Sequence, residues 1–320
     1  MAKIVECVPN FSEGRDKDKI ERIISVLKNN KQIKLINYEA DADYNRTVVT
    51  LIGEPEPMID AIIELTEVCL KEIDLNKHSG EHARMGAIDV IPFIPIHDVK
   101  MSECVSYAEK TGQLISEKFN IPCFLYAEAA RHEDRVSLPN IRKGEFEGME
   151  EKIKDPHWKP DFGPAKRHPS FGSIGIGARD FLIAYNIDID TRDEKKTNNF
   201  AKAIRNSSGG FSYVQAGPVY LENRGHTQVT MNILNYKKNP IYRVFETVKM
   251  EAKRYHYNVP SAEIVGLIPK DAIMRSLKYY YAVNDIEFNE DMSFDDIVRD
   301  AANYLQLRDF HKSKIIDYFL

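Results

Sequence analysis

Hydrophobic positions in the first 130 residues switch between helical and strand-like spacing, and they predict alternating strands and helices. An apolar face with a period of 3.6 residues, at positions 20, 23, 24 and 27, predicts one helix, and a second helical face runs from Pro55 to Ile73. Short apolar runs predict strands at 3–8, 34–39, 46–53 and 87–95. The predicted order is β-α-β-β-α-β, followed by a helix at 102–119 and a strand at 122–127.

The second half of the chain repeats this order. Its pattern predicts strands at 181–187, 213–221, 227–234 and 261–267, and helices at 191–205 and 240–256. A T-x-V-T match recurs at 47–50 and 227–230, but Thr and Val are so common in strands that coincidence explains it equally well. The matched order of elements is the stronger argument. It predicts an α+β fold of α/β type with two subdomains, 1–180 and 181–320, each built on a helix-on-sheet β-α-β-β-α-β unit.

Two stretches lie outside the repeated pattern. Residues 128–180 are rich in Pro, Gly, Arg and His, and so long a stretch without predicted elements is expected to be a functional or a disordered loop. Its aromatic residues, Trp158, Phe162 and Phe171, favour an ordered loop. Residues 270–320 have a helical pattern and are expected to form an appendage to the second subdomain.

Composition and charge exclude several classes of protein. The chain has 320 residues, of which 43% are apolar and 29% charged, as in globular proteins. Its net charge is -5 and it has no long run of Lys or Arg, so neither nucleic acid nor a membrane surface is an expected partner. The four cysteines form no C-x-x-C pair and are expected to be buried and reduced. No signal peptide or transmembrane span is expected, which predicts a cytoplasmic protein.

The polar segment at 77–86 combines two histidines, a carboxylate, two cations and two glycines just before a predicted buried strand. His78 and His82 have the i, i+4 spacing of a metal-binding helix, but Gly80 between them disfavours that helix. A histidine that transfers protons is therefore favoured over a metal ligand. A purely structural His82 remains an alternative.

Three other polar segments are less specific. At 39–47 a solvated turn accounts for Asp41 and Asp43, but less well for Arg46 at the start of an apolar strand. The glycines at 163–177 precede the predicted strand at 181–187, so they do not form a Rossmann fingerprint. Close approach of a flat ligand near Phe171 and a simple crossover between domains explain them equally well. Residues 206–210 are typical of a helix-to-strand loop.

Several runs of residues together resemble one family, the glutamate formimidoyltransferases, or formiminotransferases. The runs are V-E-C-V-P-N-F-S-E-G at 5–14, N-R-T at 45–47, G-E-H-A-R-M-G-A at 80–87, Asp89, P-F-I-P at 92–95, D-F-G-P at 161–164, G-A-R at 177–179, F-L-I-A-Y-N at 181–186 and Q-V-T-M-N at 228–232. Bifunctional relatives also carry a cyclodeaminase domain, which this chain, ending at Leu320, is expected to lack.

The resemblance implies a substrate pair, a fold and a site. The reaction is transfer of the formimino group from N-formimino-L-glutamate to N5 of the co-substrate tetrahydrofolate, in histidine degradation, by a homodimer with two α/β subdomains. His82 matches the family's catalytic histidine, and Glu39 lies where Asp is expected. The folate contacts correspond to Gly163, Pro164, Ser170, Phe171 and Gly172, and to Val214, Gln215 and Ala216.

The residues that the transfer reaction requires can also be argued from its chemistry, without the family resemblance. A protonated amidine is a cation, so carboxylates must hold it, and Glu39, Glu81 and Asp89 are candidates. A histidine can take the proton from N5 and give one to the leaving amine. The substrate carboxylates require cations, for which Arg46, Arg84 and Arg179 are the candidates. No metal, nucleotide or covalent nucleophile is required.

Two other functions remain open from the sequence. A formyltransferase or cycloligase acting on 5-formyltetrahydrofolate would use the same fold and the same histidine. A non-catalytic folate-binding protein would not need His82.

Overall fold

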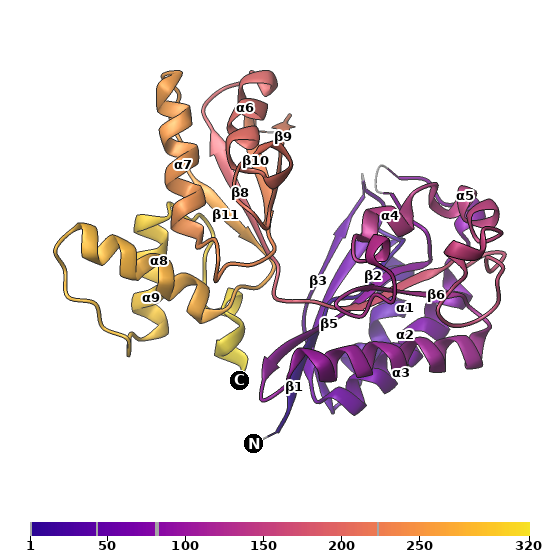
Figure 1. Cartoon of the computed structure of the whole chain (residues 1–320). Coiled ribbons are helices and arrows are strands. Elements are labelled where there is room, and N and C mark those ends of the chain that lie inside the picture. Colours follow the sequence, from indigo (N-terminus) through magenta and orange to yellow (C-terminus); the bar gives the residue numbers. More distant parts are fainter. Residues whose placement is uncertain (1, 43, 81–82, 223) are drawn as a thin grey trace. The chain divides into compact units, whose positions relative to one another are not determined.

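The computed structural model describes residues 2–42, 44–80, 83–222 and 224–320. The chain divides into two compact units, Met1–Asp180 and Phe181–Leu320, each with its own sheet (Figure 1). None of the helices in these described ranges is long and apolar enough to cross a membrane.

The first unit is built on a mixed sheet. In spatial order its strands are β3 (Ile33–Asp41), β4 (Arg46–Gly53), the pair β1 (Ile4–Cys7) and β2 (Asn10–Phe11), β5 (Ile88–His97), β7 (Ile174–Ala178) and β6 (Cys123–Ala127). Both β1 and β2 pair with β4 on one side and β5 on the other. The strands from β3 to β5 are antiparallel, whereas β5, β7 and β6 are parallel.

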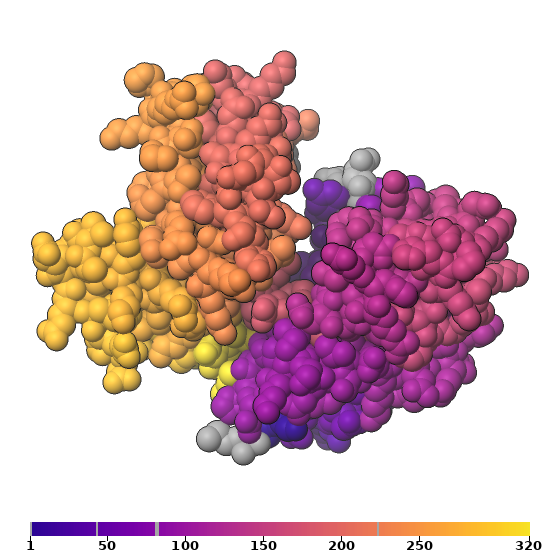
Figure 2. Space-filling view, viewed as in Figure 1, coloured from indigo at the N-terminus to yellow at the C-terminus, as the bar shows by residue number. Residues whose placement is uncertain are grey.

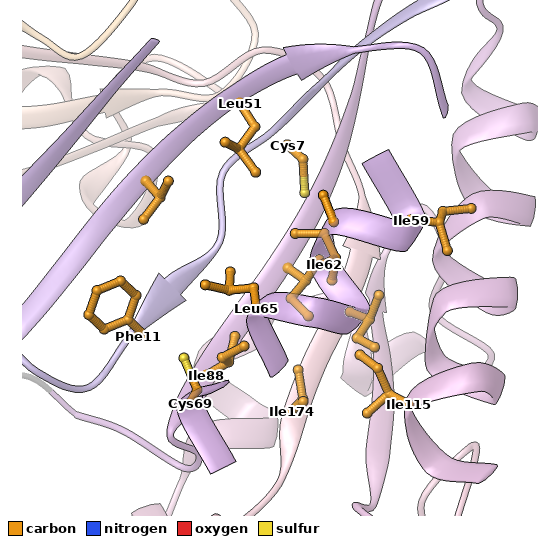
Figure 3. Packing of buried hydrophobic residues seen from close by; sticks show 14 of the residues in the cluster. Cys7, Phe11, Leu51, Ile59, Ile62, Leu65, Cys69, Ile88, Ile115 and Ile174 are labelled. Carbon is orange, nitrogen blue, oxygen red and sulfur yellow. The ribbon is translucent and has the colours of Figure 1, made fainter. Parts of the chain in front are cut away.

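Three helices cover one face of this sheet and enclose the main core. They are α1 (Lys17–Lys28), α2 (Pro55–Glu72) and α3 (Met101–Phe119), and their apolar faces pack on alternate strand residues (Figure 3). The side chains of Cys7 and Cys69 lie in this core. All four cysteines are buried and unpaired, as predicted.

The segment 128–180, inside the first unit, differs from the prediction, because it is not a long loop. It contains α4 (Leu138–Arg142), α5 (Glu145–Lys152) and the central strand β7. The residues around α4 and α5, magenta in Figure 2, form part of the surface of the first unit, whereas β7 is buried. Strand β7 was not predicted, because its glycines interrupt the apolar pattern. These glycines are required by packing, since a Cβ on Gly177 would lie 2.7 Å from the Tyr126 ring. At Gly175 a Cβ would lie 2.9 Å from Met85 Cε.

The second unit confirms the predicted repetition. Its strands β8 (Ile183–Ile189), β9 (Val214–Leu221), β10 (His226–Ile233) and β11 (Ala262–Val265) form an antiparallel sheet in the order β11-β8-β10-β9. This is the order of β5-β1-β4-β3 in the first unit. Helices α6 (Glu194–Ile204) and α7 (Ile241–Arg254) pack on the sheet, and α8 (Lys270–Val283) and α9 (Phe294–Tyr304) form the expected helical appendage.

Candidate functional site

Two segments that the sequence marked as polar lie against each other in the first unit. Backbone hydrogen bonds join residues 75–87 to residues 170–173, with Leu75 donating to the Ser170 carbonyl at 2.8 Å and Ala87 donating to the Phe171 carbonyl at 2.7 Å. Ser173 donates to the Met85 carbonyl at 2.9 Å. The predicted histidine loop and the predicted folate loop are therefore one hydrogen-bonded unit.

The turn at 39–47 and the N-terminal run at 5–14 contact the same loop. The Asn45 side chain accepts a hydrogen bond from Gly14 N at 2.9 Å and donates one to the Ser79 carbonyl at 2.9 Å. Gly80 lies so close to this turn that a Cβ would be 2.5 Å from the Tyr44 carbonyl oxygen. Three of the four polar segments, together with the N-terminal run, thus converge. The fourth, 206–210, belongs to the second unit.

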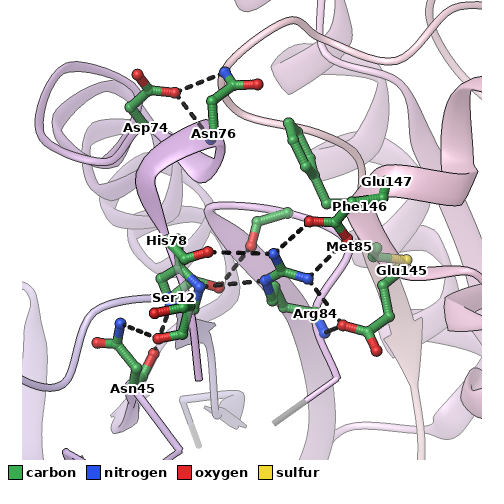
Figure 4. Close-up of polar contacts among 12 residues, drawn as sticks. Ser12, Asn45, Asp74, Asn76, His78, Arg84, Met85, Glu145, Phe146 and Glu147 are labelled. Atoms are coloured by element: carbon green, nitrogen blue, oxygen red, sulfur yellow. Dashed lines mark hydrogen bonds and ion pairs between the residues drawn. The ribbon is translucent and has the colours of Figure 1, made fainter. Parts of the chain in front are cut away.

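His78 is held as a neutral ring (Figure 4). Its Nε2 lies 2.9 Å from the Asn45 carbonyl oxygen, which can only accept, so Nε2 carries the proton. Its Nδ1 accepts a hydrogen bond from Arg84 Nε at 3.2 Å. Burial lowers the pKa of His78, and the Arg84 charge adds to this, while the hydrogen bond to Asn45 opposes it. Both ring nitrogens are used within the chain.

Arg84 is the centre of this network (Figure 4). Its guanidinium forms ion pairs with Glu145 at 2.9 Å and Glu147 at 2.7 Å, and Nη2 also donates to the His78 carbonyl at 3.4 Å. Together with the bond to His78 Nδ1, these contacts engage all five of its N–H groups. Burial alone would lower the pKa of Arg84, but the two carboxylates outweigh it and raise that pKa.

His82, which was predicted to transfer protons, and Glu81, a candidate for binding the amidinium cation, lie outside the described residues. The chain is anchored on both sides of them. Ser79 and Gly80 are fixed by the turn at 44–45, and the Arg84 carbonyl accepts a hydrogen bond from Phe146 N at 2.9 Å. Among the described residues no group of three or more His, Cys, Asp or Glu side chains could hold a metal ion.

Asp89, which was predicted to bind the amidinium cation, forms its hydrogen bonds within the protein. Its carboxylate is 1% exposed and accepts hydrogen bonds from Arg142 at 2.5 Å and from Met85 N at 2.9 Å. Burial raises the pKa of Asp89, and the Arg142 and Arg46 charges oppose this only in part. Arg46 is half-buried above the Tyr44 ring, 5.8 Å from its centre, and burial lowers its pKa.

The predicted folate loop has two glycines in the left-handed region. Gly163 has φ 89° and Gly172 has φ 87°, and a Cβ on Gly172 would lie 2.1 Å from the Met85 carbonyl oxygen. Pro164 and Ser170 are half-buried. Phe171 is fully buried in the main core, so its ring is not available to stack on a ligand.

Arg135 supports this loop, and sequence reasoning missed it. The side chain is 1% exposed and pairs with Asp161 at 2.9 Å, while its Nη2 donates to the carbonyls of His157 and Lys159. Asp161 also accepts a hydrogen bond from Leu125 N at 2.8 Å. The one feature of the sequence that could have pointed to Arg135 is its position in a stretch rich in aromatic residues.

The remaining predicted residues are placed as follows. Glu39 is exposed near the end of edge strand β3 and accepts a hydrogen bond from Asn37 at 2.8 Å. Arg179 follows β7 and is half-buried, with one N–H donated to the Asp180 carbonyl at 3.1 Å. Val214, Gln215 and Ala216 begin β9 in the second unit, where Gln215 is exposed and Val214 is buried.

Both units of the chain match one family of known proteins. Residues 4–179 match the formiminotransferase domain, N-terminal subdomain, and residues 184–320 match the formiminotransferase domain. The chain is 42% identical to a glutamate formimidoyltransferase of Streptococcus pyogenes serotype M1, over 91% of this chain and 97% of the relative.

Two further relatives extend the comparison. A glutamate formimidoyltransferase of Thermoplasma acidophilum is 42% identical over 94% of this chain and 99% of its own length. A formimidoyltransferase-cyclodeaminase of Dictyostelium discoideum is 41% identical over 89% of this chain, which covers 54% of that longer protein. The matches cover both units and every segment of the site, and the chain belongs to the formiminotransferase family.

Proposed function

We propose that this protein transfers the formimino group from N-formimino-L-glutamate to N5 of tetrahydrofolate, releasing L-glutamate and forming 5-formiminotetrahydrofolate. The observation that carries the proposal is the convergence of residues 10–14, 44–47, 78–80, 83–87 and 170–173. Two relatives that this chain matches over nearly their whole length are named for this activity.

In this reaction N5 attacks the amidinium carbon, and the bond from that carbon to the glutamate nitrogen then breaks. His82 takes the proton that N5 loses and returns a proton to the departing glutamate amine, as general base and then general acid. Arg46 and Arg179 bind substrate carboxylates. Arg84, whose N–H groups are all engaged within the chain, holds the loop in place instead of binding a substrate carboxylate.

Tetrahydrofolate is the co-substrate in this proposal, and its ring lies along residues 163–172, with further contacts to 214–216. Because the Phe171 ring is in the core, contacts from 171–172 to the folate come from the backbone. The protein acts without a metal ion, as a homodimer in the cytoplasm.

The test is a comparison of two one-carbon donors. Formiminoglutamate with tetrahydrofolate should react at least about tenfold faster than 5-formyltetrahydrofolate with glutamate, a difference of about 1.4 kcal/mol in the transition state. The reason is that a formyl donor develops an oxyanion, which carboxylates in the site stabilise poorly. Equal or inverted rates would assign the protein to formyl transfer.

A further inference from the structure

The strand register places an acidic residue of the first unit, Glu6, on the sheet face opposite α1–α3. Its neighbours Val5 and Cys7 point into the main core, so Glu6 points the other way. Glu6 lies opposite Ile52 on β4 and Ile94 on β5. Glu6 therefore projects between two aliphatic residues on the face that the three core helices leave free.

Arg179 lies in the row of residues that crosses the strands of the sheet through Glu6 and Ile94. In the register of β5 and β7, Phe93 is opposite Ala178, and Arg179 N donates to the Phe93 carbonyl at 3.1 Å. Ala178 points into the core, so Arg179 emerges on the face that carries Ile94 and Glu6. Two strand spacings separate Glu6 from Arg179, about 10 Å between their Cα atoms.

The Glu6 side chain is almost fully buried, and only the charge of Arg179 compensates its carboxyl group. It is 3% exposed, and within the described part of the chain no hydrogen bond or ion pair reaches it. Burial raises the pKa of Glu6 to about 7, and the charge of Arg179 opposes this. The other deeply buried carboxylates described above, Asp89 and Asp161, each pair with an arginine. A buried carboxyl group with unused acceptors points to a ligand that brings the donors.

The donor in the proposed reaction has the complementary charges. In N-formimino-L-glutamate the amidinium nitrogen and the α-carboxylate are attached to the same carbon, so a cation and an anion lie side by side. The Arg179 side chain donates to the Asp180 carbonyl and is also hydrogen-bonded to Tyr126, which leaves others of its five N–H groups for such a carboxylate. We propose that Glu6 binds the amidinium group of the donor while Arg179 binds the adjacent carboxylate.

This inference rests on the proposed function and adds the residue that selects the donor. An amidinium group offers N–H donors and a positive charge to Glu6. A formyl group at the same place offers a carbonyl oxygen, which an ionised carboxylate repels. Glu6 therefore makes the site specific for a formimino over a formyl donor.

The experiment compares the binding of two ligands by calorimetry at about pH 8, without tetrahydrofolate so that no transfer occurs. The ligands are N-formimino-L-glutamate and N-formyl-L-glutamate, which differ in the one group that Glu6 is proposed to bind. The wild-type protein should prefer the formimino compound by about 10- to 100-fold, the worth of one charge-assisted hydrogen bond. Glu6→Gln should reduce the preference to less than about threefold, and Glu6→Asp should keep part of it.

Two controls separate the possible failures. Arg179→Gln should weaken both ligands equally, because both carry the carboxylates, and Glu64→Gln, at an exposed position on α2, should change neither affinity. If wild-type protein with tetrahydrofolate shows no turnover of the formimino compound, the proposed function fails. If it turns the compound over but Glu6→Gln keeps the full preference, Glu6 does not bind the amidinium group.

Discussion

Replacing Glu6 by Gln should stabilise the first unit at alkaline pH but not at acidic pH. The pKa of Glu6 is raised from 4.5 to about 7 by burial, so between these values the folded protein keeps a proton that the unfolded chain has lost. Since the folded state binds more protons in this window, the wild-type free energy of unfolding falls as the pH rises through it. Each pH unit is worth about 1.4 kcal/mol, which gives a full effect of about 3 kcal/mol above pH 7.

The glutamine variant has no group to ionise at this position, so its stability relative to wild type should increase across the same window. Urea unfolding followed by the fluorescence of Trp158, the one tryptophan of the chain, reports on the first unit. The difference between variant and wild type should grow by about 3 kcal/mol from pH 4.5 to pH 8. Glu64→Gln provides the matched control at an exposed position. A difference that is the same at every pH would show that the Glu6 carboxyl group is not uncompensated in the folded protein.

Other predictions follow from the site. His82→Gln should leave the unfolding transition unchanged and reduce kcat by about 10² to 10⁴, and retention of more than about a tenth of the wild-type kcat would exclude an essential proton transfer by His82. Arg84→Leu should lower the melting temperature, because the free energy of unfolding falls by about 1.5–3 kcal/mol. The fall should be nearer the lower figure, since Glu145 and Glu147 remain open to solvent. Arg179→Leu should instead raise KM with little change in melting temperature. If Arg84→Leu raised KM and Arg179→Leu lowered the melting temperature, Arg84 would be the residue that binds substrate and Arg179 the structural one. Activity should survive exhaustive chelation, whereas stoichiometric metal whose removal abolishes turnover would contradict a metal-free mechanism.

The order of elements could be predicted because each is defined by its own periodicity. The helices α1 and α2 and the strands of the second unit follow from local apolar spacing, and the shared strand order confirms the repetition. Strand β7 could not be predicted, since Gly175 and Gly177 have no side chains to show an apolar pattern. Their need for space depends on Tyr126 and Met85, which only the tertiary structure brings close.

The polar segments that lie together could also be picked out from the sequence, whereas the roles of their residues stay predictions. The segments at 39–47, 77–86 and 162–173 were recognisable because they concentrate polar residues and glycine, and they lie together. Arg135 and Arg142 were missed because their partners, Asp161 and Asp89, are 26 and 53 residues away. Glu6 was missed because a single carboxylate in a strand is usually solvated.

The neutral state of His78 has a consequence for how the site responds to acidity. Burial lowers its pKa from the ordinary 6.5, which favours the neutral ring that makes the hydrogen bonds to Asn45 and Arg84. Gaining a proton at Nδ1 would set two positive charges against each other and break the contact with Arg84. The contact between His78 and Arg84 is thus insulated from the titration that the proposed mechanism assigns to His82. Of the two histidines at 77–86, His82 is the one proposed to change charge in each turnover, whereas His78 stays neutral and holds the loop in place.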